Sequence, residues 1–102
     1  MYKLKFSEYI YKDVESSVEY IKNVLKNPVA SQRLKDEVKK IKQNPLIYPS
    51  VPIENLEKKG FKFYIVKNYM LFFKVKKDEN IVNIERFLYG PRDWITILGN
   101  IN

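Results

Sequence analysis

FKFYIVKNYMLFFKVKKDENIVNIERFLY, residues 61–89, is the stretch that decides the fold of this chain. It is dense in aromatic and β-branched residues, which favour the pleated, half-buried surface of a β-sheet. Turn-forming residues interrupt it twice, at 67–68 and at 78–80. The stretch therefore predicts three consecutive strands, which we place at 61–66, 69–76 and 81–88.

The residues at the start of the chain predict a further strand and a helix. Tyr2, Leu4 and Phe6 alternate with lysines, the period-two pattern of a strand with one covered face. Ser7 then offers a hydroxyl that can cap a helix from residue 8 to residue 26. The apolar positions of this helix fall on one stripe, which consists of Ile10, Val14, Val18, Ile21 and Leu25.

A second helix is expected directly after the first. Asn27 can cap it and Pro28 is favourable as its first residue, whereas proline disfavours a helical conformation in the residue before it. Asn44 and Pro45 close the second helix. Its apolar stripe is Ala30, Leu34, Val38 and Ile41. Two helices in tandem predict an antiparallel hairpin.

The remaining segments are a loop and a short tail. Residues 45–60 contain three prolines and break both periodicities, so we expect a loop with one short helical turn at 53–59. Gly90 and Pro91 end the last strand, and one or two helical turns follow up to Gly99. The predicted fold class is α+β: one domain over residues 1–102, with the helical hairpin packed on a mainly antiparallel four-stranded sheet. The first strand is expected to pair with the last or a central strand.

Composition narrows the functional classes. The 102 residues include no cysteine and no histidine, which argues against disulfides, thiolate chemistry and a zinc site, and we expect neither a metal nor a cofactor. No stretch approaches the roughly 20 apolar residues of a membrane span, and the start of the chain lacks the apolar run of a signal peptide. The cytoplasm is the expected compartment. A net charge of +7 favours nucleic acid or an acidic protein as partner.

Arg86, Tyr89 and Arg92 are the candidate catalytic residues. They lie at the end of the last strand and in the turn after it, where side chains can converge. Arginines suit the metal-independent attack of an RNA 2′-hydroxyl on its own phosphate, because they stabilise the developing charge. Each residue also has a structural alternative. Arg86 could be a half-buried partner of a carboxylate, and Tyr89 could be a core residue with a solvent-exposed hydroxyl. Arg92 could form part of the cap of the tail helix.

A second candidate site is a basic face of the sheet. Lys62, Lys74 and Lys76 occupy alternating strand positions and are expected to line one face, with Tyr69 as a stacking surface for unpaired RNA bases. Tyr64 and Phe73 offer further rings. The same pattern also fits an ordinary solvated face.

Three segments resemble the RelE/ParE superfamily of type II toxins, which includes proteins called plasmid stabilisation proteins. FSEYIYKDVESSVEYI (6–21) is similar to the opening strand and helix of the family, including an aspartate after a short polar and apolar run. GFKFYIVKNYMLFFKV (60–75) is similar to its central hairpin, and IERFLYGPRDW (84–94) to its last strand and exit. The resemblance implies an α+β fold with a concave basic sheet opposite the helical hairpin, toxicity to the producing cell, and a cognate antitoxin in a hetero-oligomer.

The resemblance implies one of two activities, and a third hypothesis assigns no activity beyond antitoxin binding. RelE-like members cut messenger RNA on the ribosome; carried over, Arg86 would stabilise the phosphate, Tyr89 would stack on or deprotonate the nucleotide, Arg92 would hold the backbone and Lys62 would be an auxiliary contact. Met70 replaces the usual arginine of that branch, and the chain has no C-terminal histidine. ParE-like members inhibit DNA gyrase by binding. We rank the endoribonuclease first, the gyrase inhibitor second and an inert antitoxin-binding protein third.

Overall fold

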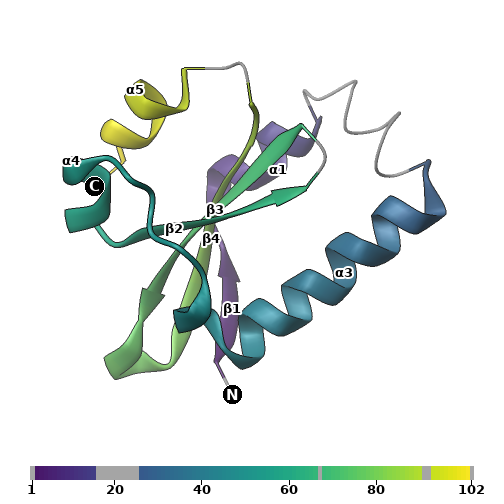
Figure 1. Ribbon diagram of the computed structural model, residues 1–102, viewed down its shortest axis with the longest axis horizontal. Coiled ribbons are helices and arrows are strands. Elements are labelled where there is room, and N and C mark those ends of the chain that lie inside the picture. The colour runs from purple at the N-terminus through teal and green to yellow at the C-terminus, as the bar shows by residue number, and fades with distance from the viewer. Residues whose placement is uncertain (1, 16–25, 67, 91–92, 102) are drawn as a thin grey trace.

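The computed structural model describes residues 2–15, 26–66, 68–90 and 93–101 (Figure 1). The helices and strands alternate with short turns along the chain. In order they are β1 (Lys3–Phe6), α1 (Glu8–Glu15), α3 (Pro28–Gln43), the 3-10 turn η2 (Pro45–Ile47), α4 (Glu54–Lys58), β2 (Phe61–Val66), β3 (Tyr69–Lys76), the 3-10 turn η3 (Lys77–Glu79), β4 (Ile81–Tyr89) and α5 (Trp94–Gly99).

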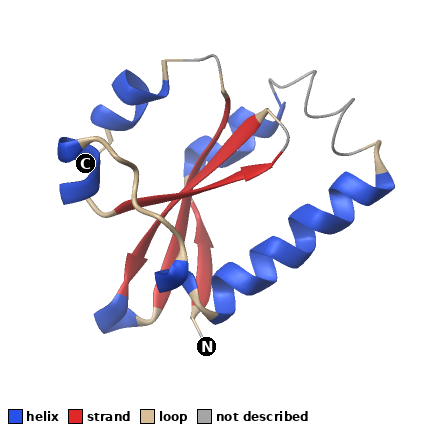
Figure 2. Cartoon of the chain, in the orientation of Figure 1, coloured by secondary structure: helices blue, strands red, loops and turns tan. Residues whose placement is uncertain are grey.

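The four strands form one sheet in the order β1-β4-β3-β2 (Figure 2). β2 pairs antiparallel with β3, and β3 pairs antiparallel with β4, which gives the predicted meander. β1 pairs parallel with β4, so the first strand joins the last one, as expected. The α+β fold class and the strand positions predicted from the sequence are therefore confirmed.

One face of the sheet packs against α1 and α3. The buried core on this side contains Ile10 of α1 and Ile41 of α3. Leu34 and Val38 of α3 pack at its margin. The sheet contributes the buried residues Tyr69, Leu71, Phe73, Val82, Ile84 and Phe87. We call this side the helix face.

The opposite face of the sheet carries a second core under α4 and α5. It consists of Val51, Leu56, Phe61, Phe72, Leu88 and Leu98. Trp94 packs on Phe72 with the ring centroids 5.6 Å apart and so anchors the tail on the sheet. The resemblance implied an open, concave and basic face on this side. That prediction is wrong for this part of the sheet, because apolar residues of the loop and the tail cover it.

The start of α3 follows its sequence signal, whereas the Ser7 hydroxyl makes a different contact from the predicted helix cap. The side chain of Asn27 accepts a hydrogen bond from the backbone N–H of Val29, so Asn27 caps α3 as predicted. The hydroxyl of Ser7 donates to the backbone carbonyl of Glu85 in β4, which fixes the start of α1 on the sheet. Residues 16–25 of the predicted first helix lie outside the described residues.

The predicted loop at 45–60 contains two short helical turns, η2 and α4. Gly60 follows α4 with a φ of +89°, in the left-handed region that glycine adopts without strain, and its N–H donates to the carbonyl of Glu57. In the part of the chain that the structure describes, no helix is long and apolar enough to cross a membrane.

We expect Phe72→Ala to destabilise the fold strongly. Phe72 is fully buried, so removal of its ring leaves a cavity and lowers the free energy of unfolding by about 3–5 kcal/mol. Urea denaturation followed by circular dichroism measures the change. Ile47→Ala is the control, because Ile47 is 71 % exposed and its truncation is expected to change stability by about 0.5 kcal/mol or less. Equal losses for the two variants would contradict the described core.

Candidate functional site

The last strand, β4, contains a β-bulge directly before the candidate catalytic residues. Phe72 of β3 pairs with Arg86 and the next residue, Phe73, pairs with Ile84, so Glu85 is the extra residue. The bulge changes the alternation of side chains along β4. Ile84 and Phe87, three positions apart, consequently belong to the same core on the helix face.

Arg86, the residue directly after the extra one, binds Asp13 of α1. The guanidinium group binds the carboxylate through two parallel hydrogen bonds, Nε to Oδ2 at 2.8 Å and NH2 to Oδ1 at 2.7 Å. The backbone N–H of Phe87 also donates to Oδ2 of Asp13, at 3.0 Å. The side chain of Asp13 is 4 % exposed and that of Arg86 is 14 % exposed. This is a buried, bidentate ion pair that joins α1 to β4.

Arg86 has a second neighbour in α1. Its guanidinium carbon lies 5.1 Å from the centre of the Tyr9 ring, a distance that allows a cation–π contact. The charge of Arg86 is therefore engaged by one carboxylate and one aromatic ring. This arrangement agrees with the structural alternative for Arg86, a partner of a carboxylate, and α1 contributes that carboxylate.

The other two members of the predicted catalytic cluster are described only in part. The backbone of Tyr89 pairs with that of Tyr69 at the end of β4, and its side chain lies outside the description. Arg92 lies outside the described residues. Gly90 follows Tyr89, and its N–H donates to the carbonyl of Asn68, at 2.6 Å. A Cβ atom at position 90 would lie 3.1 Å from that carbonyl oxygen, so glycine suits this close approach.

The three predicted RNA-binding lysines do not share a face. Lys62 is paired with Phe73, whereas Lys74 is paired with Phe61, and directly opposed residues of an antiparallel pair point to the same side. Lys62 therefore lies on the helix face, while Lys74 and Lys76 lie on the side of α4 and α5. The expectation of one shared lysine face is wrong, because the register between β2 and β3 sets Lys62 apart.

Each of these lysines has a contact within the chain. The amine of Lys62 donates to the backbone carbonyl of Tyr48 at 2.8 Å. The amine of Lys74 lies 4.6 Å from the centre of the Phe61 ring. The amine of Lys76 lies 3.9 Å from Glu79 in an exposed ion pair.

Burial affects the ionisation of the Lys74 region. Burial lowers the pKa of Lys74, an effect that the nearby Glu85 partly offsets. Burial likewise raises the pKa of Glu85, and Lys74 and Lys76 partly offset it. The region thus places a half-buried lysine near a half-buried carboxylate.

Tyr69, the predicted stacking surface, is a core residue. It is 2 % exposed, and its ring stacks on that of Phe87 with centroids 4.8 Å apart. The stacking partner is therefore a phenylalanine of the same sheet, which leaves the Tyr69 ring covered.

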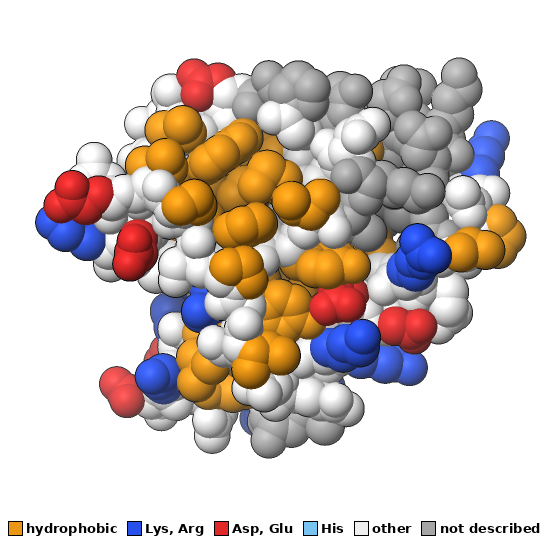
Figure 3. All heavy atoms as spheres, viewed as in Figure 1, with side chains coloured by type: hydrophobic (Ala, Val, Ile, Leu, Met, Phe, Trp, Pro, Cys, Tyr) orange, Lys and Arg blue, Asp and Glu red, His pale blue; other side chains and the backbone are white. Residues whose placement is uncertain are grey.

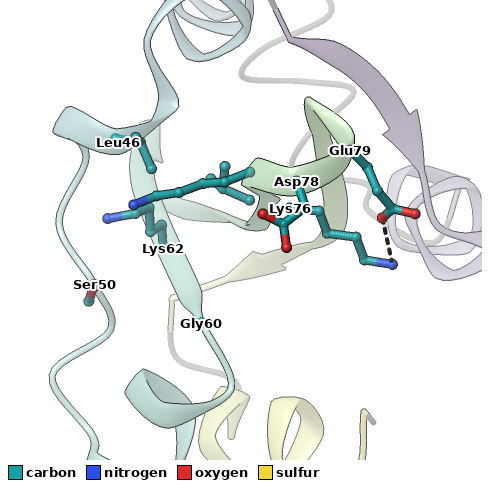
Figure 4. Close-up of a pocket in the computed structure, with 9 residues that line it drawn as sticks. Leu46, Ser50, Gly60, Lys62, Lys76, Asp78 and Glu79 are labelled. Carbon is teal, nitrogen blue, oxygen red and sulfur yellow. Dashed lines mark ion pairs between the residues drawn. The ribbon is translucent and has the colours of Figure 1, made fainter.

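An open hollow lies at the end of the sheet where β2 and the β3–β4 turn meet (Figure 4). Its volume is about 880 Å³. Its walls combine apolar, basic and acidic side chains: Leu46, Ser50, Gly60, Lys62, Val75, Lys76, Lys77, Asp78 and Glu79. Among the described residues, no group of three acidic, cysteine or histidine side chains is placed to hold a metal ion.

Comparison with known families decides what kind of protein this is. The model of the family described as the ParE toxin of type II toxin-antitoxin system, parDE, matches residues 4–94. The chain belongs to the ParE toxin family. A search of curated protein sequences found no match. The match runs from β1 to the first residue of α5, so it includes both partners of the Asp13–Arg86 pair.

Membership of the ParE toxin family makes this protein the toxin of a type II toxin-antitoxin system. It also implies a cognate antitoxin as the partner of the toxin. The resemblance to the RelE/ParE superfamily noted in the sequence is confirmed.

Sequence reasoning missed the partner of Arg86 in this ParE-family toxin. Asp13 was noted only as a position that the family shares, without a role. One signal was present: α1 offers a carboxylate among apolar positions, and a carboxylate at such a site requires a partner.

Tyr48 is a further buried group that the sequence did not single out. Its hydroxyl donates to the carboxylate of Glu37 in α3, and its ring packs edge-on against Phe73. Burial, together with the Glu37 hydrogen bond, raises the pKa of Tyr48 above its ordinary value of 10.0. Tyr48 therefore connects α3 to the segment in front of β2.

We expect Arg86→Met to destabilise the toxin because it leaves the Asp13 carboxylate buried without its cation. The free energy of unfolding should fall by about 3–5 kcal/mol. The double variant Asp13→Asn/Arg86→Met should recover most of this loss, since it buries no charge and the amide oxygen that replaces the carboxylate can still accept from the N–H of Phe87. Urea denaturation of all four members of the cycle measures the coupling. A loss in Arg86→Met that the second substitution does not relieve would contradict the ion-pair account.

Alkaline pH should destabilise the toxin through Tyr48. The unfolded chain releases the Tyr48 proton near its ordinary pKa of 10.0, while the folded protein retains it. The contribution of Tyr48 to the free energy of unfolding is therefore fully present below that pH and is lost as the pH rises above it. Tyr48→Phe should show a shallower decline, measured as the free energy of unfolding against pH. A decline of the same slope in wild type and Tyr48→Phe would rule out this linkage.

Proposed function

We propose that this ParE-family toxin arrests growth by binding DNA gyrase and not by cutting messenger RNA. The main support for the proposal is the environment of Arg86. Two hydrogen bonds to Asp13 neutralise its guanidinium, and its side chain is only 14 % exposed. An arginine that stabilises a phosphorane must present its donors to the phosphate. Reaching a phosphate would require Arg86 to break a buried ion pair, which is costly.

The surroundings of Arg86 support the same choice. Met70 occupies the position where RelE-like toxins usually have an arginine, and it packs at the margin of the second core. Tyr69 is buried and Lys62 donates to Tyr48, so two of the predicted RNA contacts are used within the fold. Inhibition by binding requires no catalytic constellation and tolerates each of these features. We therefore rank gyrase inhibition above messenger RNA cleavage, the reverse of the ranking made from the sequence alone.

The first test follows methionine and thymidine incorporation side by side after induced expression of the toxin. We expect thymidine incorporation to fall first, because gyrase inhibition stops DNA synthesis before protein synthesis. Purified toxin should also inhibit supercoiling of relaxed plasmid by purified gyrase. Early loss of methionine incorporation with intact gyrase activity would replace this proposal with the ribonuclease, in which Tyr89 and Arg92 are the residues to dissect.

A variant test separates chemistry at Arg86 from its structural role. Arg86→Ala alone is ambiguous, because loss of the ion pair can abolish toxicity by unfolding the protein. We expect Asp13→Asn/Arg86→Met to keep the fold while it removes the guanidinium, so a gyrase inhibitor should still arrest DNA synthesis in this variant. Loss of arrest in this folded double variant would count against the proposal and in favour of a direct role of Arg86.

A further inference from the structure

The side of the sheet that faces α4 and α5 is apolar at one end and basic at the other. Figure 3 shows hydrophobic side chains gathered over α5 and the neighbouring part of the sheet, and Figure 1 shows α4 and α5 away from the N-terminus. The second core includes Phe72 of β3, and the next residues of β3 on the same side are Lys74 and Lys76. Lys74 is half-buried and Lys76 is exposed, so the cover ends along β3.

The edge strand β1 brings two further lysines to this basic end. Leu4 packs against the core on the helix face, so its neighbours in the strand, Lys3 and Lys5, point to the opposite side. The pairing of β1 with β4 and of β4 with β3 arranges side chains in two rows across the strands. One row is Lys5, Asn83 and Lys74, and the other is Lys3, Ile81 and Lys76. We call the four lysines of these rows the lysine patch.

The charge of the lysine patch is largely uncompensated on β1. Within the described part of the chain, no carboxylate forms an ion pair with Lys3 or Lys5, and both side chains are exposed. Lys76 has Glu79 at 3.9 Å, but both partners are exposed, and such pairs are weak. The β1 side of the patch therefore presents positive charge to the solvent.

The β3 side of the patch crowds positive charges around one carboxylate. Burial lowers the pKa of Lys74, and the nearby Glu85 partly offsets this effect. The charges of Lys59 and Lys76 are close enough to lower the same pKa further. A bound anion would relieve this repulsion, because it supplies the negative charge that Glu85 alone provides to several lysines.

The spacing of the lysine patch suits the phosphates of a nucleic acid duplex. β4 lies between β1 and β3, and strands are spaced about 4.8 Å apart, so the two columns of lysines are separated by about 10 Å. The two lysines within one column are about 7 Å apart along the strand. The grooves of B-form DNA are about 6 and 12 Å wide. Flexible lysine side chains on the two columns can therefore reach the phosphates on both borders of one groove.

The patch offers charge without an exposed aromatic ring. Unpaired bases are ordinarily held by stacking on aromatic side chains. The ring that lies 4.6 Å from the amine of Lys74 belongs to Phe61, which is fully buried, as is Phe72. Protein interfaces likewise centre on large apolar or aromatic anchors, whereas the polar Asn83 occupies the middle of one row. These features favour the backbone of a duplex over unpaired RNA or an acidic protein.

We propose that the lysine patch binds the phosphate backbone of duplex DNA and so holds the toxin on the DNA that gyrase acts on. The inference rests on the proposed function for the source of that DNA. A net charge of +7 adds long-range attraction to a polyanion. Contacts that reach only phosphates carry no base specificity, so the binding is independent of DNA sequence.

Titration of a short fluorescent DNA duplex with the purified toxin, followed by fluorescence anisotropy, tests the binding. Four phosphate contacts release counterions, so the affinity should fall about 100-fold between roughly 50 and 200 mM salt. A duplex of unrelated sequence should bind equally well. Absence of duplex binding at the lower salt concentration would overturn the proposal.

Lys3→Gln/Lys5→Gln locates the binding on the lysine patch. Both side chains are exposed, so the variant should fold, which circular dichroism confirms. We expect its affinity for the duplex to fall about tenfold or more and its salt dependence to become shallower. The matched control is Lys35→Gln/Lys39→Gln, which removes the same charge from exposed positions of α3, the helix on the other face. An equal loss in the control would overturn the assignment to the patch, because net charge alone would then explain the binding.

Two competitors distinguish duplex DNA from the other polyanions. We expect unlabelled duplex to displace the labelled duplex more effectively than single-stranded RNA or polyglutamate at the same concentration of charge. Stronger displacement by the RNA would overturn the proposal in favour of an RNA site. Stronger displacement by polyglutamate would overturn it in favour of an acidic protein.

Gyrase assays separate this inference from the proposed function. We expect Lys3→Gln/Lys5→Gln to bind gyrase like the wild type when no DNA is present, but to require about tenfold more toxin to inhibit supercoiling. Equal inhibition by the variant and the wild type would contradict the inference alone. A wild-type toxin that leaves gyrase fully active would contradict the proposed function, while the anisotropy titration still decides whether the patch binds duplex DNA.

Discussion

The carboxylate of Asp13 binds three donors that come from one point in β4. Two belong to the guanidinium of Arg86 and one is the backbone N–H of Phe87, so a single buried side chain fixes α1 on the sheet. Seventy-three positions separate Asp13 from Arg86 in the sequence. Either charge alone would be costly in this environment, and the pair therefore constrains the first helix and the last strand together.

The bulge in β4 lies directly beside this contact. It keeps Phe87 on the helix face with Ile84, while Arg86 pairs with Phe72 and Glu85 lies near Lys74. Apolar cores cover the helix face and part of the opposite face, and the described residues leave free the second half of the β2 edge and the open hollow beside Lys62. A surface of this kind suits recognition of other proteins, which agrees with the antitoxin partner that the family implies and with the proposed inhibition of gyrase by binding.

Local patterns predicted the elements well because they are consequences of local chemistry. The alternation and the turns in 61–89 located three strands, and Asn27 with Pro28 located the start of α3. The family resemblance added the class of toxin, which the match over residues 4–94 confirmed. The candidate site was less predictable: Lys62 and Lys74 share a period along the sequence, but the strand register places them on opposite faces.

The sequence by itself determined the order of elements, the α+β class and the basic charge, because periodicity, capping residues and composition act over a few residues at a time. Only the tertiary structure decided the partner of Arg86, the burial of Tyr69 and the row that brings Lys5 and Lys74 to one patch. These properties depend on which strands are neighbours, on their register and on one inserted residue in β4. Such contacts join residues far apart in the chain, and no local pattern specifies them.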